Sequence, residues 1–233
     1  MAALLLGILA LLGSGVTIGI ALCAASMLFI LYDPMLDART VGQSFFSFLA
    51  SYSLMAVPLF IFAGFLMERT GMVRQLFQFA EALVSWIRGG FGLATVTTCV
   101  MFSAISGSSV AVASAMSLIA IPEMRKRNYP DWMSAGIVAS GGGIGLLIPP
   151  SLSLIIFGVA TETSIVRLFM AGIIPGLLLA LGMYVVIIIA ASRVSSLTRG
   201  KFSLHTLITS TAGALPGLGM PVLVLGGLYG GLF

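Results

Sequence analysis

The chain alternates between long apolar blocks and short polar turns. Five of the blocks contain no Asp, Glu, Lys or Arg, namely residues 41–67, 89–122, 132–161, 168–192 and 202–233. Each block exceeds the roughly 20 residues that an α-helix needs to cross the hydrocarbon core of a bilayer. The apolar/polar alternation over about ten positions that marks a membrane β-barrel does not run through them. The pattern therefore predicts an all-α polytopic membrane protein.

The N-terminal part of the chain predicts two spans and two helices that lie along the membrane surface. Residues 1–32 are interpreted as a retained membrane segment with a candidate break at Gly13-Ser14-Gly15, because no basic residue precedes Arg39 as a signal peptide requires. Residues 41–53 are mildly amphipathic and rich in aromatic side chains, and residues 54–67 form a second span. Residues 71–90 place apolar positions at helical spacing opposite a polar face, which is typical of an interfacial amphipathic helix.

Basic residues place both ends of block 89–122 on the same side of the membrane. Arginines precede the block and Arg125, Lys126 and Arg127 follow it, and such residues concentrate in cytoplasmic loops. A segment that begins and ends on one side must turn inside the membrane, and its arms, 90–105 and 110–121, are each too short to span. The block is therefore predicted to be a re-entrant helical hairpin with Ser106-Gly107-Ser108-Ser109 at its tip.

Glycines and prolines interrupt the next block. Four glycines between positions 141 and 145 precede Pro149-Pro150, and in a helix interior Gly costs about 1 kcal/mol and Pro about 3 kcal/mol. Block 132–161 is therefore predicted to be a broken helix, with unwound backbone near the middle of the membrane. Such backbone occurs at that depth only where it is buried in protein or lines a cavity.

The remaining residues predict a return to the basic side. Residues 165–191 form a spanning helix that Pro175 kinks. Residues 203–215 are expected to lie along the membrane surface, and residues 216–233 begin a further span.

The hairpin tip and the broken helix together offer neutral oxygen atoms to a small ligand. Half-helix C-termini and unwound carbonyls suit sodium, whereas half-helix N-termini suit a carboxylate. Neither motif contains Asp or Glu, which disfavours Ca²⁺ and Mg²⁺ and a proton-carrying carboxylate. The candidate sodium- and substrate-binding residues are Ser103, Ser106, Gly107, Ser108, Ser109, Gly141, Gly143, Gly145, Pro149, Pro150 and Ser151.

Composition narrows the function classes. Hydrophobic residues make up 59% of the chain and charged residues 8%, against roughly 25% charged residues in soluble domains. The net charge of +4 comes from a few basic residues at the ends of the apolar blocks, so no nucleic-acid partner is predicted. Cys23 and Cys99 have no CxxC or His partner and are expected to pack as small hydrophobes.

Two other interpretations of the serine and glycine motifs stay open. Small residues also line tight contacts between membrane helices, so packing alone is an alternative explanation of the tip. An intramembrane hydrolase would need a base beside one of the serines, but the only histidine, His205, lies far along the chain and no GxSxG motif occurs. No enzyme activity is therefore predicted.

Several linked motifs resemble a known family over essentially the whole chain. They include "AVPLFIFAGFLMERTGM" at 56–72, "RGGFGLATV" at 88–96, "SAISGSSVA" at 103–111, "IPEMRKRNY" at 121–129, "IGLLIPPS" at 144–151, "LFMAGIIPGLLL" at 168–179 and "LPGLGMPVLVLGGLYGGLF" at 215–233. In this order they resemble the large membrane subunit of the tripartite ATP-independent periplasmic (TRAP) transporters. One departure is Leu146, where many members of that family have proline.

The resemblance implies a fold, a function and partners. The expected fold is the first repeat of an inverted-repeat, elevator-type transporter of the bacterial inner membrane. The expected function is sodium symport of organic acids, such as C4-dicarboxylates or sialic acid, with a periplasmic binding protein and a small membrane subunit. By resemblance, sodium binds around Ser103, Ser106 and Ser109 facing Gly143 and Gly145. Two alternatives remain, another ion-coupled anion symporter of similar architecture and a non-transporting truncated remnant.

The resemblance also divides the chain into three regions. Residues 1–88 form scaffold-like spans and an interfacial helix, residues 89–163 form half of a transport domain, and residues 164–233 form a returning span, an interfacial segment and the start of the next span. Members of the family are about twice as long, so the second repeat is expected to be absent from this sequence and supplied by the same or a separate chain.

Overall fold

The computed structural model describes residues 2–32, 38–194, 197, 200 and 203–230. The chain divides into two units, Met1–Ser51 and Tyr52–Phe233, and each is described by itself. Every regular element in these described ranges is a helix, and no strand occurs among them. The all-α prediction is confirmed.

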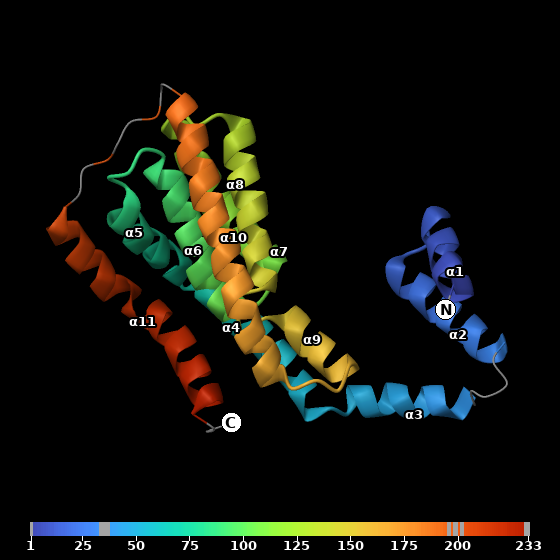
Figure 1. The fold of residues 1–233 in the computed structure, drawn as a ribbon. Helices are drawn as coiled ribbons and strands as arrows, with labels where there is room; N and C mark the ends of the chain where they lie inside the picture. The colour runs from blue at the N-terminus through green and yellow to red at the C-terminus, as the bar shows by residue number, and fades with distance from the viewer. Residues whose placement is uncertain (1, 33–37, 195–196, 198–199, 201–202, 231–233) are drawn as a thin grey trace. The chain divides into compact units, whose positions relative to one another are not determined.

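The first unit contains three short helices, α1 (Ala2–Gly13), α2 (Ile18–Tyr32) and α3 (Ala38–Leu49). Gly15 adopts a left-handed φ of 82° and reverses the chain, so that α1 and α2 pack against each other (Figure 1). At 12 and 15 residues, neither helix reaches the roughly 20 residues of a full span. The candidate break at Gly13-Ser14-Gly15 is confirmed as a complete turn, so residues 1–32 do not form one spanning helix.

The second unit holds the rest of the helices. They are two short 3₁₀ turns (Tyr52–Met55 and Ile144–Leu146), α4 (Ala56–Arg69), α5 (Met72–Val84), α6 (Gly90–Ser106), α7 (Ser109–Lys126), α8 (Asp131–Gly143), α9 (Leu152–Ala160), α10 (Ile165–Arg193) and α11 (Leu204–Tyr229). Among the described residues, Tyr52–Arg69, Ile165–Arg193 and Leu204–Leu223 are long and apolar enough to cross a membrane.

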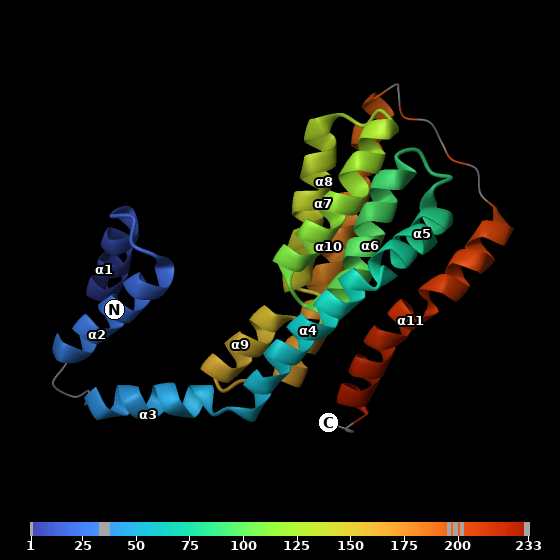
Figure 2. The same cartoon turned by 180° about the vertical axis from the view of Figure 1, so that it is seen from behind.

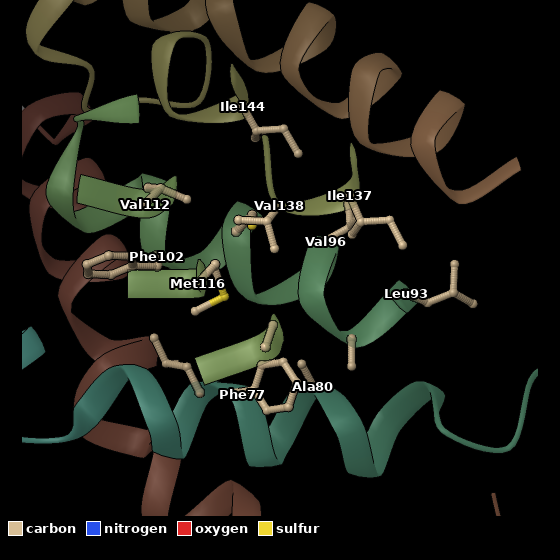
Figure 3. Close-up of a cluster of buried hydrophobic side chains, with 14 of the residues drawn as sticks. Phe77, Ala80, Leu93, Val96, Phe102, Val112, Met116, Ile137, Val138 and Ile144 are labelled. Carbon is tan, nitrogen blue, oxygen red and sulfur yellow. The ribbon is translucent and has the colours of Figure 1, made fainter. Parts of the chain in front are cut away.

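Helix α6 lies at the centre of this unit. Figures 1 and 2 show α6, α7, α8 and α10 running side by side, and α4, α5 and α11 also contact α6. Figure 3 shows how Phe77, Leu93, Phe102, Met116 and Ile144, from four segments of the chain, meet in one buried cluster. A helix that is apolar on all sides is expected to be surrounded, and residues 90–99 are all buried.

The amphipathic prediction for residues 71–90 is confirmed in α5, whose apolar face packs against α6 and α11. Its position at a membrane surface stays a prediction. The C-terminal prediction is wrong, because residues 204–229 form one helix that runs through Pro216 and Pro221. A proline removes one backbone donor, and membrane helices tolerate that loss because neighbouring groups can satisfy the freed carbonyl.

Candidate functional site

Helices α6 and α7 are joined by only two residues, Gly107 and Ser108. Gly107 has a φ of 60° and donates its backbone N–H to the Ser103 carbonyl at 3.0 Å, which ends α6 with a left-handed cap. Ser108 has an extended backbone, and its hydroxyl accepts the Ala111 N–H at 3.4 Å, which begins α7. The sequence Gly-Ser thus stops one helix and starts the next at the predicted tip.

The interruption after α8 begins later than the glycine run predicts. Gly141, Gly142 and Gly143 lie inside α8, and the chain leaves regular α-helix between Ile144 and Ser151. A Cβ at Gly141 would lie 2.7 Å from the Cys99 Sγ, and one at Gly142 would lie 2.8 Å from the Ala113 Cβ. These glycines therefore allow α8 to approach α6 and α7 closely, and they do not unwind the backbone.

Residues 144–151 then connect the two half-helices, and the first three of them form a 3₁₀ turn. Pro149 and Pro150 are joined by a cis peptide bond, and Ser151 donates its hydroxyl to the Leu146 carbonyl at 2.8 Å before α9 begins at Leu152. The broken helix predicted for residues 132–161 is confirmed, with its break displaced toward the prolines.

The hairpin tip and the helix break touch each other. The Leu152 N–H donates to the Gly107 carbonyl at 3.0 Å. A Cβ at Gly107 would lie 2.6 Å from the Pro150 carbonyl oxygen, and one at Gly145 would lie 3.0 Å from the Ser109 Cα. Two segments separated by about forty positions therefore form one site, in which Gly107, Ser109, Gly145 and Pro150 are in close contact.

Three other residues need separate placement. Gly141 packs on Cys99, and no heavy atom lies within 4 Å of a Cβ built at Gly143, so neither shows the close contact with the tip that Gly145 makes. Gly64 of α4 was missed in the sequence: a Cβ there would lie 3.1 Å from the Ser106 Cβ, so α4 covers the tip. A lone glycine inside a long apolar span gave no signal for this contact.

The serine hydroxyls at this site differ in their partners. Ser103, Ser106 and Ser151 are at most 2% exposed. Ser151 bonds Leu146, and the Ser106 hydroxyl accepts the Ser108 N–H at 3.5 Å. The Ser103 hydroxyl has no hydrogen-bond partner within the described chain, although burying an unpaired hydroxyl costs about 1–3 kcal/mol. An unpaired buried group of this kind calls for a ligand or a water molecule.

Helix ends set the electrostatics of the site. The C-terminus of α6 carries partial negative charge, and the N-termini of α7 and α9 carry partial positive charge. Within the described residues, no group of three His, Cys, Asp or Glu side chains is placed to hold a metal ion. The arrangement supplies neutral oxygens, which can bind a monovalent cation, next to helix N-termini, which can bind a carboxylate.

Several known proteins are similar to this chain over most of its length. The C4-dicarboxylate TRAP transporter large permease protein DctM of Vibrio cholerae is 38% identical over 221 residues, which cover 94% of this chain and 49% of that protein. The protein of the same name from Pseudomonas aeruginosa is 41% identical over 211 residues, which cover 90% of this chain and 49% of that protein. The sialic acid TRAP transporter large permease protein SiaM of Vibrio cholerae is 33% identical over 227 residues, which cover 97% of this chain and 53% of that protein.

The chain spans about half the length of the curated relatives it matches. A family model described as the tripartite ATP-independent periplasmic transporter, DctM component, matches residues 5–233. Because this match runs through almost the whole chain, the chain belongs to the DctM family of TRAP transporter components.

Proposed function

We propose that the chain forms part of a permease that imports organic acids by sodium symport. Family membership and membrane-length helices make it a multi-pass protein of the bacterial inner membrane. Relatives named for C4-dicarboxylates and sialic acid support organic acids as the substrate class. The proposed partners are a periplasmic substrate-binding protein, a small membrane subunit and the second repeat of the fold, in the same or a separate chain.

The observation that carries the sodium site is the unpaired Ser103 hydroxyl. It is fully buried and lies one helical turn before the tip, where α6 ends and the break meets α7. A bound sodium ion takes a neutral hydroxyl oxygen as a ligand, and the partial negative charge at the α6 C-terminus favours a cation. We assign the substrate carboxylate to the N-termini of α7 and α9, which carry the opposite partial charge.

The depth of the tip supports a re-entrant hairpin. The tip is bonded to the first residue of α9, and α9 continues for nine residues before the loop at 161–164. Nine helical residues rise about 14 Å, which is roughly half of the 30 Å hydrocarbon core. In the proposed elevator mechanism, α6 to α9 move together as half of the transport domain.

A sodium-dependent unfolding measurement tests the ion site directly. We expect the purified chain to unfold at a higher temperature in sodium than in potassium, by about 1.4 kcal/mol of stability at a sodium concentration tenfold above Kd. Ser103→Ala removes this difference, yet in potassium it unfolds at the same or a higher temperature because the unpaired hydroxyl is gone. Ser114→Ala, an exposed serine on α7, keeps the sodium effect. A full sodium effect in Ser103→Ala would remove Ser103 from the site.

Transport is tested by uptake of labelled organic acids into proteoliposomes under an imposed sodium gradient. We expect uptake only when the chain is combined with a second-repeat polypeptide, a small subunit and a binding protein. Uptake without any binding protein would favour the other class of ion-coupled anion symporter. No uptake and no sodium effect in any combination would favour a non-transporting remnant.

A further inference from the structure

A polar cavity lies between α5 and α7, away from the proposed transport site. Its volume is ≈ 350 Å³. Its polar lining comes from Arg74, Gln78 and Glu81 of α5 and from Glu123 and Arg127 at the end of α7. These residues belong to the end of the unit that carries the Arg125-Lys126-Arg127 cluster, which marks the cytoplasmic side.

The other part of the lining is apolar, and Leu118 and Pro122 within it are exposed. Leu118, Ile119 and Pro122 of α7 contribute to it, together with the ring of Phe91. Leu118 is 73% exposed, and Val110, two turns earlier on the same face, is equally exposed. The cavity therefore has a charged end that continues into an exposed apolar stripe. This arrangement matches an amphiphilic molecule, which has a charged head group and an apolar tail.

Ion pairs fix most of the charges around the cavity. The Arg127 Nη2 lies 2.7 Å from the Glu81 Oε1, and its guanidinium stacks over the Phe91 ring at 4.2 Å. The Lys126 Nζ lies 2.7 Å from the Glu123 Oε1, and this hydrogen bond holds the pKa of Glu123 below its ordinary value. Each of the two carboxylates is thus matched by a cation.

Arg74 remains as the surplus charge. The cavity is lined by two cations, Arg74 and Arg127, and by two carboxylates, Glu81 and Glu123. Arg127 pairs with Glu81, and Lys126, which lies outside the lining, pairs with Glu123, so among the described residues the positive charge of Arg74 is left without an ion pair. Arg74 is exposed at the cavity, and none of the ion pairs within the described residues involves it. The cavity is therefore complementary to a ligand with one negative charge.

We propose that this cavity binds an anionic phospholipid with a single phosphate, such as phosphatidylglycerol. The phosphate lies at Arg74 and the outer edge of Arg127, because guanidinium groups bind phosphate through paired hydrogen bonds. One acyl chain follows Leu118 and Pro122 along α7. Anionic lipids occupy the cytoplasmic leaflet, and basic pockets between helices on that side bind their head groups. The apolar stripe favours a lipid over a free phosphate ion, which needs no such surface.

Native mass spectrometry of the purified full chain in detergent tests the proposal. We expect phosphatidylglycerol to bind about tenfold more tightly than phosphatidylcholine with the same acyl chains. Arg74→Gln reduces this preference to near unity. Arg193→Gln, an exposed arginine at the end of α10, leaves it unchanged. Leu118→Ser weakens both lipids, whereas Ile174→Ser on α10, a residue that is 67% exposed and outside the cavity, weakens neither.

Several outcomes would overturn the lipid site. Equal binding of the two lipids, or an unchanged preference in Arg74→Gln, would show that the positive charge of Arg74 does not select the lipid. Displacement of phosphatidylglycerol by millimolar glycerol phosphate assigns the cavity to a soluble phosphate. Loss of bound phosphatidylglycerol when the small membrane subunit is added assigns it to a protein partner. Unfolding temperatures in phosphatidylcholine alone confirm that all four variants fold.

Discussion

At the scale of single residues, Gly107 meets two requirements that only glycine satisfies. Its φ of 60° is left-handed, and the Pro150 carbonyl oxygen occupies the space where a Cβ would stand. The same residue accepts the hydrogen bond from Leu152 that ties the tip to the helix break. The geometry of the proposed ion site therefore depends on this one position.

Gly107→Ala is expected to destabilise the chain. The left-handed backbone alone costs about 1–2 kcal/mol, and the clash at 2.6 Å adds to it. Gly143→Ala is the matched control, because Gly143 has a φ of −60° and open space beside it. It is expected to be neutral or to stabilise by up to about 1 kcal/mol. Thermal unfolding in detergent compares the two, and equal unfolding temperatures would contradict the assigned tip geometry.

Tyr129 gives a pH-dependent prediction at the same scale. Its phenol oxygen accepts the N–H of Gly92 in the first turn of α6 at 3.3 Å, and burial raises the pKa of the phenol above its ordinary value of 10.0. The folded chain thus favours the neutral phenol. The contribution of this phenol to the stability of the fold is present below about pH 10 and is lost as the pH rises through its pKa in the folded chain.

Tyr129→Phe tests this linkage. Below about pH 10 the variant is expected to be less stable by about 1–3 kcal/mol, because the buried Gly92 N–H loses its acceptor. Above that pH the wild-type chain loses the advantage, so the difference between the two chains narrows. Unfolding midpoints of both chains from about pH 8 to about pH 11 measure it. A constant difference across this range would show that Tyr129 does not titrate with unfolding.

At the scale of elements, glycine has two uses that a sequence does not separate. The turn at Gly107-Ser108 was predicted because basic residues flank block 89–122 at both ends and Ser106-Gly107-Ser108-Ser109 interrupts its apolar sequence. The start of the helix break was misplaced because Gly141 and Gly142 serve close packing of α8 against α6 and α7. The distinction depends on the distance to another helix, which the sequence of one helix does not contain.

The same limit explains the other errors in helix length. Gly15 turns the chain completely, whereas Pro216 and Pro221 lie inside a continuous α11. Each is a residue that weakens a helix, and its neighbours in space decide whether the helix ends. The amphipathic α5 was predicted well because its own 3.6-residue pattern specifies the buried face.

Helix α8 offers a matched test of close packing. Gly142→Leu is expected to destabilise the chain by about 1–3 kcal/mol, because the added side chain forces α8 away from α7. Even a Cβ at this position would lie only 2.8 Å from the Ala113 Cβ. Gly136→Leu lies on the same helix with no atom within 4 Å and is expected to be neutral. Unfolding temperatures of the two variants test this expectation. Equal losses in both would show that close packing against α7 does not set the effect, because helix propensity alone favours Leu over Gly at either position.

At the scale of the whole molecule, the second unit has polar residues at two opposite ends of its helices. The loop that contains Arg125, Lys126 and Arg127 follows α7, and Arg193 ends α10, so both helices end at basic residues. The loop at 161–164 joins α9 to α10. The tip lies one α9 length from that loop, and both the proposed ion site and the proposed re-entrant hairpin depend on this depth.

Accessibility of single cysteines tests that depth. In a Cys23→Ser background, which removes the exposed thiol, Thr163→Cys is expected to react with a bulky impermeant maleimide from the periplasmic side. Lys126→Cys reacts only after the cytoplasmic side is opened. Ser108→Cys at the tip reacts from neither side until the protein is unfolded, because about 14 Å of α9 separates it from the periplasmic loop. The background chain, whose Cys99 is buried, stays unlabelled. Periplasmic labelling of Ser108→Cys as fast as that of Thr163→Cys would mean that α6 and α7 cross the membrane completely, and the tip would then face water, where a buried ion site cannot form.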